Sequence, residues 1–315
     1  MKLFFRIILK IFLILTILAG CATTQEIKET DPSALLNQDV AFEKEGQYDR
    51  AIVNYNKAIE INPRDAEAYN NRGVDYQKKG QYDKAIANYN KAIEINPSYA
   101  YPYYNRGGAY KNKGQYDNAI ADYNRAIEIN PKDAEAYNNR GGAYKNKGQY
   151  DKAIADYNKA IEINPRYADP YYNRGGAYKN KGQYDKAIAD YNKVLEINPR
   201  DAEAYNNRGV AYAYKGQYDK AIADNNKAIE INPRYAEAYY NRGVDYQKKG
   251  QYDMAIADYY KAIEINPKDA KAYNNRGLAY YKKGQIDMAC SDWKRACELG
   301  LFNACEQAKR RGFCK

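Results

Sequence analysis

A strict 34-residue period constrains this chain more than any other feature of its sequence. Near-copies of the stretch GQYDKAIADYNKAIEINP recur along the chain, and each closing proline follows the previous one by 34 residues. These prolines are Pro63, Pro97, Pro131, Pro165, Pro199, Pro233 and Pro267. A fixed period of this size is typical of a repeat array, in which one continuous core grows with repeat number. One repeat is therefore the unit to interpret.

One copy, residues 66–99, predicts two amphipathic helices joined by a turn. Its first half places small and apolar side chains on one helical stripe, and Gly80 is expected to end that helix. Its second half repeats apolar residues at helical spacing from Asp83, an expected N-cap, to Pro97, which stops the helix. Counting Ala66 as position 1, we name the first helix of each repeat its A helix and the second its B helix.

A glycine stands at position 8 of every repeat from the second onward. In mid-helix it costs about 1 kcal/mol against alanine, unless a closely packed neighbour offsets the loss. Its recurrence predicts a point where two helices cross. These residues are Gly73, Gly107, Gly141, Gly175, Gly209, Gly243 and Gly277.

The spacing resembles the tetratricopeptide repeat, a helix-turn-helix family. The matching residues are Tyr69 at position 4, Gly73 at 8, Tyr76 at 11, Ala85 at 20, Tyr89 at 24, Ala92 at 27 and Pro97 at 32. The resemblance implies an all-α, right-handed α-solenoid (superhelix) of eight repeats plus a C-terminal capping helix, with the repeats covering 272 of 315 residues. They are residues 32–65, 66–99, 100–133, 134–167, 168–201, 202–235, 236–269 and 270–303, followed by a cysteine-bearing cap over 304–315.

Some positions depart from the family pattern. Position 7 is arginine where the family often has leucine, and such an arginine is expected to snorkel along a neighbouring helix. In the last repeat Trp293 stands at position 24 and Leu301 replaces the proline, as expected of a capping repeat. Asn225 occupies position 24 of the sixth repeat, a core position that is tyrosine in the other repeats before the last, and this predicts a local weak point.

The N-terminus predicts an export signal over residues 1–20. Lys2, Arg6 and Lys10 form a basic start, and an apolar run over 11–18 follows. That run is too short to span a bilayer, which needs about 20 residues, and suits the core of a signal peptide.

The signal ends in Leu-Ala-Gly-Cys at residues 18–21, which resembles the bacterial lipobox. The resemblance implies that Cys21 is lipidated and becomes the mature N-terminus, with residues 21–31 as a lipidated tether. Ala22 follows, and it is not the aspartate that retains such lipoproteins in the inner membrane. We therefore expect a lipid-anchored protein of the bacterial cell envelope, in the outer membrane facing the periplasm.

The last 26 residues hold Cys290, Cys297, Cys305 and Cys314. Four cysteines in an exported protein indicate two disulfides, for which three connectivities exist. An antiparallel helical hairpin turning near Leu301 favours nested Cys297–Cys305 and Cys290–Cys314 bridges, and the segment also resembles cysteine-bearing Sel1-like repeats. Zinc binding is the alternative, but the spacings lack a C-x-x-C pair.

Nothing in the sequence indicates catalysis or a cofactor. The chain has no histidine, the commonest general base, and no glycine-rich phosphate loop. Its net charge of +10 comes from residues of both signs interspersed through every repeat, which is typical of a solvated surface. We expect no enzyme, no cofactor, no metal and no nucleic-acid partner. An enzyme of polysaccharide metabolism is an alternative, and only the absence of a recognisable set of catalytic residues argues against it.

Position 6 carries the strongest functional pattern, because it is asparagine in every repeat. In the family, positions 2, 5, 6, 9, 12 and 13 line the inner, concave face, and the pattern is similar to the asparagine ladder by which some superhelices hold peptides. An amide both donates and accepts hydrogen bonds, as a peptide backbone requires. The alternative is that duplication copied one harmless residue. The asparagines are Asn37, Asn71, Asn105, Asn139, Asn173, Asn207, Asn241 and Asn275.

Position 5 alternates between asparagine and tyrosine, and the last residue of the preceding repeat alternates in step between aspartate and tyrosine. Tyr104, Tyr172 and Tyr240 are either aromatic contacts for a ligand or packing partners of the tyrosine five residues earlier. Positions 12 and 14 add a mildly basic rim that favours acidic ligands. Its members are Lys111, Lys113, Lys145, Lys147, Lys179 and Lys181.

These features predict a membrane-anchored protein-protein interaction module. It would bind an extended peptide or protein segment of unknown identity on its concave face, in cell-envelope assembly. The alternative is a self-associating structural scaffold of the envelope.

Replacing Cys21 with alanine tests the anchor. Without a thiol to acylate, the protein should move from the membrane pellet to the soluble fraction, because the acyl chains supply the membrane affinity. Fractionation followed by immunoblotting measures this, with Cys290→Ala as a control that leaves the lipobox intact. Retention of the Cys21→Ala protein in the pellet would contradict the lipobox interpretation.

Overall fold

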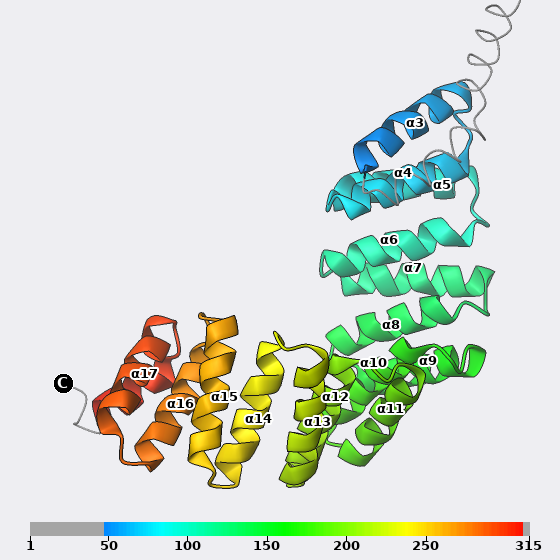
Figure 1. Ribbon diagram of the computed structural model, residues 1–315. Helices are drawn as coiled ribbons and strands as arrows, with labels where there is room; N and C mark the ends of the chain where they lie inside the picture. The colour runs from blue at the N-terminus through cyan, green and yellow to red at the C-terminus, as the bar shows by residue number, and fades with distance from the viewer. Residues whose placement is uncertain (1–46, 311–315) are drawn as a thin grey trace, which may run out of the picture. The chain divides into compact units, whose positions relative to one another are not determined.

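A computed structural model describes residues 47–310, which form helices and turns without a strand (Figure 1). The described residues fall into two compact units that divide between Lys147 and Gly148. The first unit holds α3 (Tyr48–Ile61), α4 (Ala66–Lys78), α5 (Tyr82–Ile95), α6 (Ala100–Asn112), α7 (Tyr116–Ile129) and α8 (Ala134–Asn146). The predicted first helix of the first repeat lies outside the described residues.

The second unit continues the same alternation of shorter and longer helices. It holds α9 (Tyr150–Ile163), α10 (Ala168–Asn180), α11 (Tyr184–Ile197), α12 (Ala202–Tyr214), α13 (Tyr218–Ile231), α14 (Ala236–Lys248), α15 (Tyr252–Ile265), α16 (Ala270–Lys282), α17 (Ile286–Glu298) and α18 (Phe302–Arg310). Within each unit the A and B helices of a repeat pack together, and each B helix packs on the next A helix. The predicted all-α solenoid of helix-turn-helix repeats is confirmed.

The turn between the two helices of a repeat depends on one glycine. Gly80 has a φ of 70°, a left-handed conformation that glycine adopts without strain. The equivalent glycines of the later repeats have the same conformation, so every A helix ends at the same position. The predicted N-cap of the B helix was wrong by two residues. Gln81 occupies the N-cap of α5, and Asp83 lies in the first turn, where it forms an ion pair with Lys113 of the next repeat.

The core is built from a tyrosine at position 24 and small residues around it. Tyr89 of α5 is fully buried between Ala85 of its own helix and Ala109 of the next A helix. A Cβ added to Gly73 would lie 2.6 Å from Cε1 of Tyr89, closer than real Cβ contacts allow. The helix crossing predicted from position 8 is therefore the place where this ring fits, and only glycine leaves room for it.

The arginines at position 7 join three helices on the other side of the A helix. Arg208 of α12 donates from Nε and Nη2 to the Asp224 carboxylate on α13, at 2.8 and 2.6 Å. Its Nη1 donates to Oδ1 of Asn192 on α11 at 2.6 Å. The guanidinium also lies 5.3 Å from the ring centroid of Tyr205. This bidentate, half-buried contact recurs in other repeats, and it gives the arginines a firmer role than snorkelling.

A polar pair replaces the aromatic packing between the sixth and seventh repeats. Asn225 is 1% exposed, and its Nδ2 donates to Oδ2 of Asp245 on α14 at 3.3 Å, while its Oδ1 has no partner among residues 47–310. Asp245 stands where the third to sixth and the eighth repeats have alanine, and burial raises its pKa to about 7. Two desolvated polar groups in a core position give a physical reason for the expected weak point.

Gly243→Ala and Gly209→Ala should differ although both glycines stand at position 8. An added Cβ at Gly243 would lie 2.9 Å from Cε1 of Tyr259, whereas at Gly209, which faces Asn225, the nearest atom is 3.2 Å away. Overpacking should cost Gly243→Ala about 1–3 kcal/mol of unfolding free energy, and Gly209→Ala should be near neutral because alanine favours a helix. Denaturant midpoints measure the difference, and equal losses would contradict the ring-fit explanation.

Asp245 should make the protein less stable as pH rises. The folded state holds this proton more tightly than the unfolded chain, where aspartate titrates near pH 3.9, so stability falls between about pH 4 and 7. The loss should approach about 1.4 kcal/mol per pH unit inside that window. Asp245→Asn removes the charge and keeps the shape, so it should stabilise the protein more at pH 8 than at pH 5. Melting curves at both values test this, and a pH-independent gain would refute it.

Candidate functional site

Within each unit, the A helices present a row of polar side chains that connects consecutive repeats. In this row Nδ2 of the asparagine at position 6 donates to the side chain at position 5 of the preceding repeat. The pairs are Asn105 to Asn70 (3.0 Å), Asn139 to Tyr104 (2.8 Å), Asn207 to Tyr172 (2.9 Å), Asn241 to Asn206 (2.9 Å) and Asn275 to Tyr240 (3.0 Å). The donor asparagines at position 6 are half-buried, whereas Asn70 and Asn206 are buried. The constant residue and the alternating residue are thus hydrogen-bond partners.

Two other asparagines of the predicted ladder lie in the same row. Asn71 accepts from Nδ2 of Asn70 at 3.0 Å, and Asn173 of α10 is half-buried. Asn37 and Cys21, the predicted lipidation site, lie outside the described residues. We define the A-helix face, within each unit, as the surface formed by the side chains at positions 5, 6 and 12 of the A helices.

Lysines at position 12 complete this face. Nζ of Lys111 donates to Oδ1 of Asn139 at 2.8 Å, and Nζ of Lys179 donates to Oδ1 of Asn207 at 2.7 Å. Burial lowers the pKa of both lysines, and nearby Lys145 lowers that of Lys111 further. An ammonium group held by an amide oxygen, without a carboxylate bonded to it, is suited to an anionic ligand.

The lysines at position 14 do not contribute to the predicted basic rim. Lys113 and Lys147 pair with Asp83 and Asp117 of the preceding repeats, and Lys181 pairs with Asp151. These pairs are exposed on the aspartate side, so each contributes little to stability. The ion pairs neutralise the lysines at position 14, so the basic character of the rim depends on the lysines at position 12 alone.

The alternating tyrosines pack on a different partner from the one predicted. The ring of Tyr104 lies edge-on to Tyr123, the core tyrosine of its own repeat, with centroids 5.9 Å apart. Tyr99, the residue five positions earlier, instead lies edge-on to Tyr101. The Tyr104 hydroxyl donates to Oε2 of Glu135 at 3.2 Å. The ring is therefore anchored in the core while its hydroxyl reaches the A-helix face.

The fifth repeat forms the same network. Tyr172 lies 5.9 Å from Tyr191, and its hydroxyl donates to Glu203 at 3.2 Å. Burial and the neighbouring Glu203 carboxylate raise the pKa of Tyr172, so the phenol stays a donor at neutral pH. Each network thus links tyrosine, glutamate, asparagine and lysine from two consecutive A helices.

The residue before each A helix alternates for a related reason. Asp65 caps α4 by accepting from the backbone N–H groups of Glu67 and Ala68, both at 3.0 Å. Tyr235 precedes α14 and makes no such cap, but its hydroxyl accepts from Nδ2 of Asn206 at 3.3 Å. Sequence reasoning found this alternation without its partners. It placed the position-12 lysines in a basic rim without their asparagine partners, and it missed the roles of Glu135 and Glu203.

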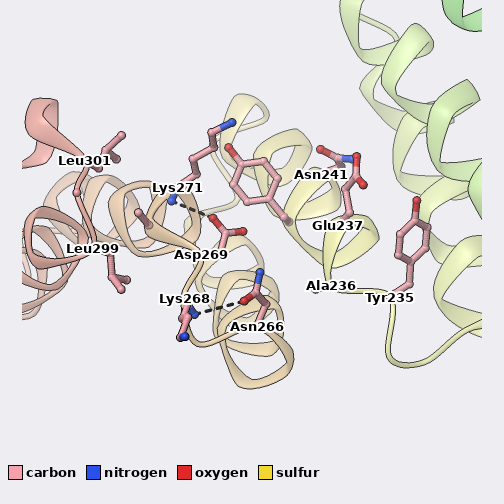
Figure 2. Close-up of a pocket in the computed structure, with 13 residues that line it drawn as sticks. Tyr235, Ala236, Glu237, Asn241, Asn266, Lys268, Asp269, Lys271, Leu299 and Leu301 are labelled. Atoms are coloured by element: carbon pink, nitrogen blue, oxygen red, sulfur yellow. Dashed lines mark hydrogen bonds between the residues drawn. The ribbon is translucent and has the colours of Figure 1, made fainter. Parts of the chain in front are cut away.

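A cavity of about 790 Å³ opens near the end of the second unit, between the beginnings of α14, α16 and α18 (Figure 2). Lys268 and Lys271 line it from α16 and the turn before it, and Leu299 and Leu301 line it from the turn before α18. Glu237 and Asn241 of α14 project toward it from the other side, with Tyr235 beyond them. The cavity therefore combines two cationic side chains with an apolar wall.

Cys297 and Cys305 are joined by a disulfide between α17 and α18, with Cα atoms 4.9 Å apart. Cys290 is buried on α17, and Cys314 lies outside the described residues, so their pairing stays a prediction. Residues 47–310 contain no cluster of side chains suited to a metal ion. In the same range, no helix is both long and apolar enough to cross a bilayer.

Sequence models of the tetratricopeptide repeat match most of the chain. One model with that description matches residues 66–99, 202–235 and 236–269, and a second matches 88–121 and 259–291. A third, described as TPR repeat, matches 41–80, 107–148, 143–182 and 176–216. No curated protein sequence matches the chain.

Two similar solved structures, each with a TM-score above 0.6, show the same fold. A tetratricopeptide repeat protein from Parabacteroides merdae is 24% identical with a TM-score of 0.61, over 79% of this chain and 98% of that one. A chain of the APC/C Cut9–Hcn1 hetero-tetramer is 19% identical with a TM-score of 0.62, over 90% of this chain and 56% of that one. YrrB, a TPR protein with an unusual peptide-binding site, is 30% identical with a TM-score of 0.49, over 58% and 95%.

Proposed function

The chain belongs to the tetratricopeptide repeat family, and from this premise we propose that it is a membrane-anchored interaction protein of the cell envelope. Proteins of this family mediate protein-protein interactions and bind peptides, and the fold is typically a non-catalytic scaffold. The ligand of this protein is an extended peptide or protein segment that lies along the A-helix face.

The observation that carries this proposal is the half-buried lysine at position 12. Lys111 and Lys179 each donate to an asparagine on the A-helix face, while the lysines two residues later are bonded to aspartates. An acidic ligand would supply the missing counter-charge. The A-helix face also carries amide groups, and an amide both donates and accepts hydrogen bonds, as a peptide backbone requires.

The envelope location rests on the sequence alone. The lipobox at residues 18–21 supports an acylated Cys21, and the residue after it supports the outer membrane, facing the periplasm. A lipid anchor and a flexible tether would hold the repeats near the membrane while leaving the A-helix face accessible to a partner.

A self-associating scaffold is the second candidate. Met254, Met288 and Phe302 expose 52%, 51% and 81% of their surface on the last two repeats and α18. Lysine, arginine or asparagine stands at the two methionine positions in the other repeats, so these exposed apolar side chains are specific to the C-terminal end. They would suit contact with a second copy of the chain.

The double variant Lys111→Gln with Lys179→Gln tests binding on the A-helix face. Loss of two half-buried positive charges should lower recovery of acidic partners at least severalfold, measured by crosslinking and quantitative mass spectrometry of envelope extracts. Each glutamine can still donate to its asparagine, so the fold should persist.

Lys113→Gln with Lys181→Gln is the matched control, since it removes the same charge from lysines that already pair with aspartates. Equal recovery with both double variants would contradict binding on this face. A loss confined to the control would place the interaction at the lysines of position 14 and not on the A-helix face.

A further inference from the structure

The third tyrosine network differs from the first two at one charge. Tyr104 and Tyr172 each accept from an asparagine of the next repeat and donate to a glutamate at its position 2. Tyr240 accepts from Nδ2 of Asn275 in the same way, at 3.0 Å, but position 2 of the next repeat is Lys271. Within residues 47–310, no carboxylate accepts a hydrogen bond from the Tyr240 hydroxyl.

The cavity of about 790 Å³ opens at this same place, and Tyr240 and Lys271 both line it. Tyr240 is held as firmly as its counterparts, because its ring packs on Tyr259 with centroids 5.9 Å apart. The cavity therefore lies next to the Tyr240 hydroxyl, where the first two networks have a glutamate, and the ring packing fixes the position of this hydroxyl. Figure 2 shows Lys271 between the Leu299 and Leu301 side of this space and the Glu237 and Asn241 side.

The charges around the cavity leave its lysines unpaired. Lys268 and Lys271 form no ion pair within residues 47–310. Of the two acidic residues that line the cavity, Asp269 is engaged as the cap of α16, with Oδ1 accepting from the backbone N–H of Lys271 at 2.9 Å. The other, Glu237, acts on Lys179 of α10, where its charge offsets part of the lowering of the lysine pKa that burial causes, so part of the Glu237 charge is already balanced.

We infer that this cavity binds a carboxylate side chain of the peptide ligand, which takes the place relative to Tyr240 that Glu135 and Glu203 take relative to Tyr104 and Tyr172. The inference rests on the proposed function and adds a defined subsite to it. In the first two networks a glutamate stands at position 2, whereas here Lys271 stands there and supplies the positive charge for the ligand's carboxylate. The Tyr240 hydroxyl donates a hydrogen bond to the same carboxylate.

The apolar wall indicates the neighbours of that carboxylate. Leu301 stands where the earlier repeats have the closing proline, whereas Leu299 stands where they have isoleucine, so Leu301 is the part of this wall that is specific to the last repeat. An acidic residue flanked by aliphatic residues would bury apolar surface against these leucines while its carboxylate meets Lys271. The preferred segment is therefore acidic and apolar in alternation.

The test uses the full chain and a fluorescent peptide with blocked ends that carries one glutamate between two leucines. Fluorescence anisotropy should show binding that weakens at least tenfold for the glutamine version of the peptide. Lys271→Glu should abolish binding, because it restores the internal acceptor of the earlier networks, and Tyr240→Phe should weaken binding severalfold while keeping the ring in the core. Lys261→Glu, an exposed lysine already paired with Glu264, makes the same charge change and should have no effect.

Other outcomes separate this subsite from the general proposal. Unchanged affinity in Lys271→Glu, with a loss in the Lys111 and Lys179 double variant, would overturn the subsite and leave the A-helix face as the binding surface. A glutamine peptide with a free C-terminus that binds as tightly as the glutamate peptide would show that the cavity takes a chain end, against the inference. Absence of binding by every peptide would overturn the subsite. The proposed function would then still be tested separately, by the recovery of partners from envelope extracts.

Discussion

The close fit between a tyrosine ring and a glycine is the contact on which the other features of each repeat depend. Tyr259 occupies the space that a side chain at Gly243 would need, and it also packs on Ala279 of the next A helix. One ring thus sets the distance between the helices of a repeat and the contact with the next repeat. Because protein interiors are close-packed, a small change here affects both of these contacts.

The polar side chains on the two sides of an A helix have different kinds of partners. On one side the arginine at position 7 bonds to both adjacent B helices, so its charge is satisfied inside the protein. On the other side the amides and lysines bond mainly to the neighbouring A helix. Lys111 and Lys179 on this side are bonded to amide oxygens and not to carboxylates, so the charge that is left for a ligand lies on the A-helix face.

Two exceptions to the repeat pattern are informative because the surrounding repeats act as references. At Asn225 and Asp245 a buried polar pair takes the place of a ring against alanine, and from this we predict lower stability that depends on pH. At Lys271 a single charge reversal leaves a tyrosine without its usual acceptor beside a cavity. In a duplicated array, a departure at one position can be compared directly with the unaltered copies in the same chain.

The sequence by itself determined the helix pairs, the turn at Gly80, the close approach at Gly73 and the special status of the asparagine at position 6. These features follow from spacing within one repeat, where helical geometry relates residues a few positions apart. Only the tertiary structure decided what each polar side chain meets. Asn139 bonds to Tyr104 and Lys111 bonds to Asn139 across 35 and 28 residues, from one repeat to the next. Such contacts depend on how stacked helices are rotated against each other, and local spacing does not contain that rotation.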